Sequence, residues 1–211
     1  MSLLNITNLS LSINGTKILQ DVSLSINTGE IVAVTGESGS GKSLTALATM
    51  GLLPEGSQTT GTITFEDQNL LTTSEADLCR IRGKYIGMVF QEPMTALNPV
   101  QTVGAQVAET ILIHGAMSKS DAIAHATDVL TRVGLPQDRY PLSRYPHELS
   151  GGQRQRVVIA MAIALRPKLL IADEPTTALD VTTQAQILDL LKDLARDYDM
   201  GLLMITHDLA V

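Results

Sequence analysis

The segment Gly36–Ser43 reads GESGSGKS and has the spacing G-x-x-x-x-G-K-[ST] of a phosphate-binding loop. Glycines let such a loop curl so that successive N–H groups point at phosphate oxygens, and the helix behind it adds its positive N-terminal end. Lys42 is predicted to reach the β- and γ-phosphates, and Ser43 to place its hydroxyl on Mg²⁺. The alternative is a Gly/Ser-rich loop with an accidental lysine. The predicted nucleotide-binding residues are Gly36, Glu37, Ser38, Gly39, Ser40, Gly41, Lys42, Ser43 and Thr45.

A second pattern is an apolar run that ends in two carboxylates, LLIADE at Leu169–Glu174. Acids at the carboxyl end of a buried strand lie at the edge where ligand sites of α/β sheets are found. Asp173 is therefore predicted to act through Mg²⁺ or its water. Glu174 is predicted to be the general base for a water that attacks the γ-phosphate. On its own, the pattern also fits an ordinary strand end with solvated acids.

The third pattern is LSGGQ, which comprises Leu149, Ser150, Gly151, Gly152 and Gln153, followed by an apolar helical stretch. Ser150 and Gln153 have the S-x-x-Q spacing of a capping box, which alone could explain them. Two glycines in a first helical turn cost about 1 kcal/mol each relative to alanine. Their expected use is close approach, and a helix start with a serine hydroxyl is suited to a phosphate.

Strands and helices alternate around these patterns. Apolar and polar residues alternate at the amino terminus, and a turn at Asn14-Gly15 indicates paired strands. The β-branched run Ile31–Val34 predicts a strand covered on both faces. Residues 101–165 look helical, and from residue 168 strands and helices alternate, which predicts a parallel α/β sheet. The other expected elements are strands at Val22–Ile26, Thr62–Phe65, Tyr85–Phe90 and Leu202–Thr206 and helices at Ser43–Leu53 and Val181–Asp197.

Composition narrows the class of protein. The chain has 211 residues, 15 basic and 22 acidic side chains, and a formal net charge of −7, so no nucleic-acid partner is expected. The single cysteine, Cys79, cannot form an intramolecular disulfide, which favours a cytosolic protein. The longest apolar run, Val157–Leu165, is nine residues, whereas a membrane span needs about 20. The amino terminus lacks the positive start of a signal peptide.

Together the three patterns resemble the ATP-binding cassette (ABC) ATPases, with GESGSGKS as Walker A, LLIADE as Walker B and LSGGQ as the family signature. Gln91 resembles the Q-loop glutamine, Thr177–Asp180 the D-loop and His207 the switch histidine. The resemblance implies an α/β P-loop NTPase with a RecA-like parallel core, an N-terminal antiparallel β subdomain and an inserted helical signature subdomain. The implied division is a core of 1–91 and 166–211 and a helical subdomain of about 92–165, in one unit that looks truncated at its C-terminus.

The resemblance also implies a site shared between two chains. ATP and Mg²⁺ would lie between the Walker motifs of one cassette and the signature residues of a second in a head-to-tail dimer. Gln91 would sense the metal and the attacking water, Asp180 would organise the dimer seam, and His207 would contact the γ-phosphate. The implied catalytic residues are Glu174, His207, Gln91 and Lys42, and the implied metal-side residues are Ser43, Gln91 and Asp173. The remaining histidines, His114, His125 and His147, are expected to be ordinary.

Within the family, residues 91–100, 172–188 and the final ITHDLAV look most like the dipeptide, oligopeptide and nickel importer branch. This resemblance implies an ATPase at the cytoplasmic face of the membrane, with permease subunits as partners and an extracytoplasmic solute-binding protein reached indirectly. Two alternatives are a soluble ABC ATPase of DNA repair or translation and an inactive truncated cassette. One departure is that Ile13 or Ile18 stands where many members stack adenine on an aromatic ring.

Overall fold

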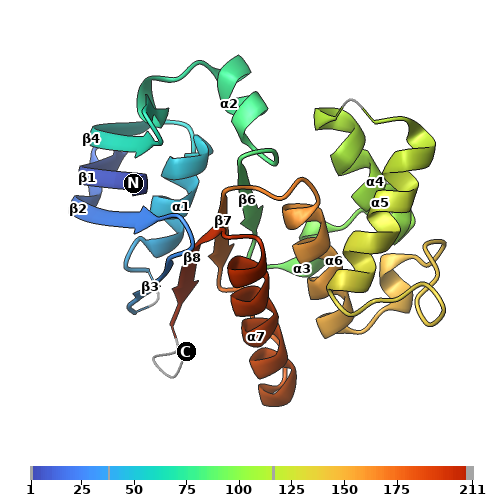
Figure 1. Ribbon diagram of the computed structural model, residues 1–211. Helices are drawn as coiled ribbons and strands as arrows, with labels where there is room; N and C mark the ends of the chain where they lie inside the picture. Colours follow the sequence, from blue (N-terminus) through green and yellow to red (C-terminus); the bar gives the residue numbers. More distant parts are fainter. Residues whose placement is uncertain (1, 38, 116, 208–211) are drawn as a thin grey trace.

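The computed structural model describes residues 2–37, 39–115 and 117–207. Two four-stranded sheets are built from different parts of the chain (Figure 1). The antiparallel sheet has the order β2-β1-β4-β5, with β1 Ser2–Ile13, β2 Thr16–Asn27, β4 Ser57–Phe65 and β5 Gln68–Asn69. The parallel sheet has the order β3-β8-β7-β6, with β3 Ile31–Thr35, β6 Ile86–Val89, β7 Leu169–Asp173 and β8 Gly201–Thr206.

The first sheet forms because its strands alternate apolar and polar residues across a tight turn. Asn14 and Gly15 both have positive φ, 49° and 82°, which suits the turn between two antiparallel strands. The register pairs Leu4 with Ile26 and Ile6 with Leu24, so the apolar side chains fall on one face. That face packs against the parallel sheet and α1, Lys42–Met50, in a common core.

The central strands of the parallel sheet feed two cores. Leu169 and Ile171 of β7 face the core shared with the antiparallel sheet, while Leu170 and Ala172 face a second core. This alternation follows from the two-residue period of a strand. All residues of β7 and β8 are buried. Because β7 and β8 are parallel, the residues that follow them lie at the same end of the sheet, and the buried strands fix their positions.

The expectation that Ile31–Val34 is covered on both faces is wrong. In the described chain, β3 pairs only with β8 and is the end strand of its sheet. Its residues alternate between half-buried and exposed, and Ile31 is 43% exposed. An unbroken apolar run predicts a strand, but whether both of its faces are covered depends on which distant segments pack against the sheet, and a local pattern does not contain that information.

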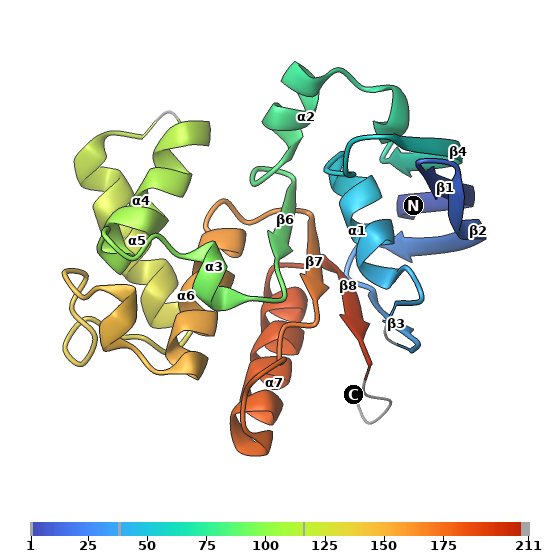
Figure 2. The same cartoon turned by 180° about the vertical axis from the view of Figure 1, so that it is seen from behind.

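Helices cover the second core and form a separate lobe (Figure 2). The lobe contains α4 Val103–His114, α5 Lys119–Arg132 and α6 Gly151–Ile163, while α7 Val181–Asp197 lies along the parallel sheet. Short pieces complete the set, namely η1 Leu70–Thr72, α2 Glu75–Ile81, α3 Pro93–Ala96 and η2 Pro146–Glu148. The parallel α/β sheet, the antiparallel subdomain and the helical insertion are thus confirmed.

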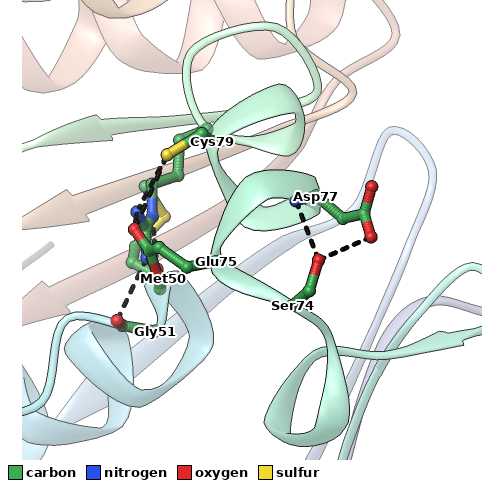
Figure 3. A network of polar contacts seen from close by, with 7 residues as sticks. Met50, Gly51, Ser74, Glu75, Asp77 and Cys79 are labelled. Carbon is green, nitrogen blue, oxygen red and sulfur yellow. Dashed lines mark hydrogen bonds and ion pairs between the residues drawn. The ribbon is translucent and has the colours of Figure 1, made fainter.

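The helix α2 and the residue that follows it hold the far end of α1. Ser74 caps α2 by accepting from the backbone N–H of Asp77 at 3.3 Å (Figure 3). Arg82 donates from Nε to the Met50 carbonyl at 2.7 Å and from a terminal nitrogen to the Gly51 carbonyl at 3.1 Å. These are carbonyls at the C-terminal end of α1, where a cation is favoured. The sequence interpretation did not include α2 or this contact.

Candidate functional site

The loop after β3 has the backbone needed to enclose a phosphate. Gly41 has φ +89°, and a Cβ built there would lie 2.3 Å from Cδ2 of Leu19. Only glycine therefore fits at the turn into α1 without moving Leu19. In the described residues, no side chain caps the first turn of α1, so its N–H groups are left for an anion. Ser38 of the predicted set lies outside the described residues.

Lys42 points back into the same loop. Its side chain is almost buried, at 8% exposed, and Nζ donates to the carbonyls of Gly36 and Glu37 at 2.7 Å each. An ammonium has three donors, so these bonds fix its direction and leave one donor for a phosphate oxygen. Thr45, by contrast, lies on the buried side of α1 and its hydroxyl donates to the Gly41 carbonyl at 3.4 Å.

Two oxygen ligands for a hard cation meet beside the loop. The Ser43 hydroxyl donates to Oδ1 of Asp173 at 3.0 Å, which joins the start of α1 to the end of β7. Burial raises the pKa of Asp173, and the Ser43 bond lowers it in part. The described residues contain no cluster of three or more His, Cys, Asp and Glu side chains that could hold a metal. Two oxygens fit Mg²⁺, since it keeps several waters and shares phosphate oxygens.

Glu174 is the centre of the site. Its Oε2 accepts from Nε2 of Gln91 at 3.0 Å and from the hydroxyl of Thr177 at 3.1 Å, and Nδ1 of His207 lies 3.4 Å away. The Glu174 side chain is only 15% exposed, and its backbone has φ 45°. A left-handed conformation is unfavourable for a non-glycine residue and is typical of functional sites. Three groups from three segments therefore hold one carboxylate oxygen in place.

Thr177 is the residue of this group that the sequence interpretation missed. It was noted only as the start of the D-loop pattern, whereas its hydroxyl contacts Glu174 directly. The signal was its spacing, because a threonine three residues after a carboxylate in a turn can reach back to it. The structure places Gln91 and His207, from two distant segments, against the same oxygen of Glu174.

The phosphate loop, Gln91 and Glu174 line a cleft of about 230 Å³. Its lining residues are Gly39, Gly41, Lys42, Ser43, Leu44, Gln91 and Glu174. Sites that enclose a whole small molecule are usually larger, roughly 300–1,000 Å³. The cleft is therefore suited to the phosphate end of a nucleotide, with the base left at the surface.

The signature residues lie elsewhere. Among the described residues that line the cleft, none belongs to Leu149–Gln153. Ser150 and Gln153 form the predicted capping box: Ser150 Oγ accepts from the Gln153 N–H at 3.3 Å, and Gln153 Oε1 accepts from the Ser150 N–H at 2.9 Å. Ser150 is exposed at the tip of α6. A single chain therefore does not join the signature to the phosphate loop.

The glycines of the signature make close contacts inside the chain. A Cβ at Gly152 would lie 2.5 Å from Cγ2 of Thr183, whereas one at Gly151 would meet Cδ2 of Leu179 at 3.4 Å. Gly152 is therefore needed for the approach of α6 to the start of α7. Asp180 caps α7 by accepting from the Thr183 N–H at 3.0 Å, and its hydrogen bonds with the side chain and then the backbone of Thr183 lower the pKa of Asp180. The signature and the D-loop are thus packed together.

Comparison with protein families identifies the chain. A family model described as "ABC transporter" matches residues 19–177, which include the phosphate loop, the signature and Asp173 with Glu174. The chain belongs to the ABC transporter family. This family membership confirms the resemblance drawn from the three sequence patterns.

The most similar curated relatives of this ABC transporter chain include two peptide-transport proteins. It is 52% identical over 90% of its length to the oligopeptide transport ATP-binding protein AppD of Bacillus subtilis, of which it covers 58%. It is 50% identical over 92% of its length to the oligopeptide transport ATP-binding protein OppD of Escherichia coli, of which it covers 57%. The chain thus spans a little over half the length of these relatives.

A solved structure has the same fold over nearly the whole ABC transporter chain. The post-hydrolysis dimer of the ATP-binding cassette MJ0796, bound to ADP and Pi, has a TM-score of 0.83 at 31% identity, covering 98% of this chain and 89% of that one. Within the described residues, no helix is long and apolar enough to cross a membrane.

Proposed function

We propose that this ABC transporter chain binds MgATP and hydrolyses ATP to drive an importer of oligopeptides, dipeptides or nickel. The observation that carries the proposal is the convergence of Gln91, Thr177 and His207 on Glu174, beside Lys42 and the Ser43–Asp173 pair. A carboxylate held in this way beside a phosphate loop fits a general base for water. The names of the relatives AppD and OppD support the substrate class.

In the proposed reaction, Glu174 accepts a proton from water as its oxygen attacks the γ-phosphorus of ATP, and ADP leaves. Gln91 and Thr177 orient the carboxylate, while Lys42 and His207 offset the negative charge that develops on the γ-phosphate oxygens. Ser43 and Asp173 would hold Mg²⁺, with Gln91 on its water side, and the bound metal supplies positive charge to the phosphates. The chain's own part is chiefly positioning, because phosphoryl transfer needs little covalent chemistry.

A second cassette completes the proposed site. The exposed Ser150 and the N–H groups at the tip of α6 would face the ATP held by the partner, and Asp180 would lie at the seam. This arrangement is supported by the separation of the signature from the cleft within one chain and by the dimer of the similar cassette MJ0796. Closure would be favoured by ATP and reversed by hydrolysis. The partner can be an identical or a related chain.

Permease subunits are the other proposed partners, with a solute-binding protein reached through them. An apolar groove of about 340 Å³ lies between α1, β6 and α6, and it exposes Phe90 and Leu52. Among the described residues that line it, Arg82 alone is charged. We propose that the chain lies at the cytoplasmic face of the membrane. We also propose that it divides into a core of residues 1–91 and 166–211 and a helical subdomain of about residues 92–165.

The experiment that tests the proposal is steady-state phosphate release by Glu174→Gln. Removing a general base is expected to lower kcat by about 10²–10⁴-fold, while ATP binding measured by calorimetry stays close to wild type. Glu55→Gln, which removes an exposed carboxylate away from the cleft, is the matched control and should retain full turnover. Turnover by Glu174→Gln equal to that of the control would refute the proposal.

A further inference from the structure

Among the described residues that line the cleft beside the phosphate loop, none is aromatic. The volume of the cleft suits only the phosphate end of a nucleotide, and beside Gly41 lie the Leu19 side chain and the Ile18 carbonyl. Ile13 and Ile18, at the expected base position, are aliphatic. A nucleobase that is left exposed at the surface binds more tightly when an aromatic ring stacks on its exposed face, because every base has a π-face that can stack.

Few rings in the chain are free to take that role. The sequence has two Phe, four Tyr and no Trp. Lysine or arginine side chains lie over the rings of Tyr85, Tyr140 and Tyr198. Phe65 is in the core, and Phe90 lines the apolar groove between α1, β6 and α6. The sixth ring, Tyr145, is 38% exposed and lies five residues before Ser150 of the signature.

Tyr145 forms a preassembled flat surface with His147. The two rings stack with centroids 5.6 Å apart and an interplanar angle of 17°, and both residues are exposed. Their backbone is held on both sides: the Tyr145 N–H donates to Glu148 Oε2 at 2.7 Å, and Nε of Arg154 donates to the Pro146 carbonyl at 2.7 Å. A stacking surface that is already ordered loses little entropy when it binds.

We propose that the Tyr145–His147 pair receives the nucleobase of the ATP held in the phosphate loop of the partner protomer. This inference rests on the head-to-tail dimer of the proposed function. Tyr145 caps η2 and His147 lies within it, five and three residues before the signature serine that would face the partner's phosphates. In that dimer we expect the pair to reach the nucleobase of the partner's ATP, beside which the partner's phosphate loop has only Ile18 and Leu19. Each protomer would then bind phosphate with its loop and base with its η2.

The test compares two substitutions at one position in a Glu174→Gln background, which holds ATP without turnover. Tyr145→Leu keeps an apolar side chain but removes the ring, while Tyr145→Phe keeps the ring. Dimerisation is followed by analytical ultracentrifugation as ATP is titrated. We expect Tyr145→Leu to raise the ATP concentration for half-maximal dimer by roughly tenfold, and Tyr145→Phe to match the unsubstituted background. His147→Ala should shift the midpoint in the same direction.

A probe without a base separates stacking from damage to the signature. Ribose 5-triphosphate keeps the sugar and phosphates, so Tyr145→Leu and its background should need the same concentration of it to dimerise. An equal loss with ATP and with this probe would overturn the inference, and so would an unchanged ATP midpoint for Tyr145→Leu. Failure of the Glu174→Gln background itself to dimerise with ATP would overturn the head-to-tail dimer, and the inference with it.

Discussion

Arg82 is expected to stabilise the end of the phosphate-loop helix, and Arg82→Gln tests this. The guanidinium donates to the Met50 and Gly51 carbonyls and also pairs with both oxygens of Glu75 at 2.5 and 3.2 Å. The Arg82 side chain is 18% exposed. The pairing with Glu75 raises the pKa of Arg82 and lowers that of Glu75.

The magnitude follows from which of these contacts are shielded from water. The bond to the Met50 carbonyl is partly buried, and a hydrogen bond from a charged group contributes about 1.5–3 kcal/mol. The bond to Gly51 and the ion pair with Glu75 are exposed and add little. Arg82→Gln should therefore lower the free energy of unfolding by about 2–3 kcal/mol, or Tm by about 4 to 12 °C for a chain of this size.

Urea unfolding followed by circular dichroism measures this loss, with Arg80→Gln as the matched control. Arg80 lies in α2, two residues before Arg82, and within the part of the chain that the structure describes it forms an ion pair only with Asp77, at 2.9 Å, with its side chain 79% exposed. Its substitution should change stability by less than about 0.5 kcal/mol. Because the pKa of Glu75 is lowered in the fold, its contribution is present above its unfolded pKa and is lost as pH falls through its folded pKa. Equal effects of Arg82→Gln and Arg80→Gln would refute the capping role.

Three further predictions concern the site. Lys42→Ala should weaken ATP binding at least tenfold in calorimetry, because the loop loses its one ammonium, and unaltered affinity would count against the phosphate loop. Asp173→Asn should raise Tm without nucleotide while abolishing the Mg²⁺ dependence of ATP binding. Burial raises the pKa of Asp173, so its contribution to stability is present below its unfolded pKa and is lost as pH rises through its folded pKa. The gain in Tm should therefore grow as pH rises through the folded pKa of Asp173. Gly152→Ala should cost about 1–3 kcal/mol by overpacking against Thr183, whereas Gly151→Ala, with a 3.4 Å contact, should cost less.

Local patterns predicted most of the site and the type of most elements. The phosphate loop, the Ser150–Gln153 capping box and the carboxylates after β7 depend on residues that are close in sequence. Their chemistry is therefore visible in spacing alone. The helix α7 was also predicted with the bounds Val181–Asp197, because its apolar residues recur with helical period and Asp180 caps it.

The missed features depend on contacts between distant segments. The open face of β3 depends on which segments pack against that side of the sheet, and the role of Arg82 depends on the approach of α2 to α1. The close contact of Gly152 with Thr183 joins two helices that are far apart in sequence. The sequence therefore predicted only that Gly152 lets a phosphate approach, and not that it lets α7 approach. The helix α2 was overlooked although Ser74 and Asp77 have the spacing of a cap, since it is a single short helix with little periodic signal.

The central claim is that each ATP lies between the phosphate loop of one protomer and the signature of the other. Mixing two inactive variants tests it directly. Lys42→Ala disables the loop, and Ser150→Asp retains a good helix cap but places a negative charge where the phosphate is proposed to lie. In a head-to-tail dimer of the two, one site combines an intact loop with an intact signature. We predict that mixing restores ATP hydrolysis well above that of either variant alone, and a mixture as inactive as its components would contradict the account.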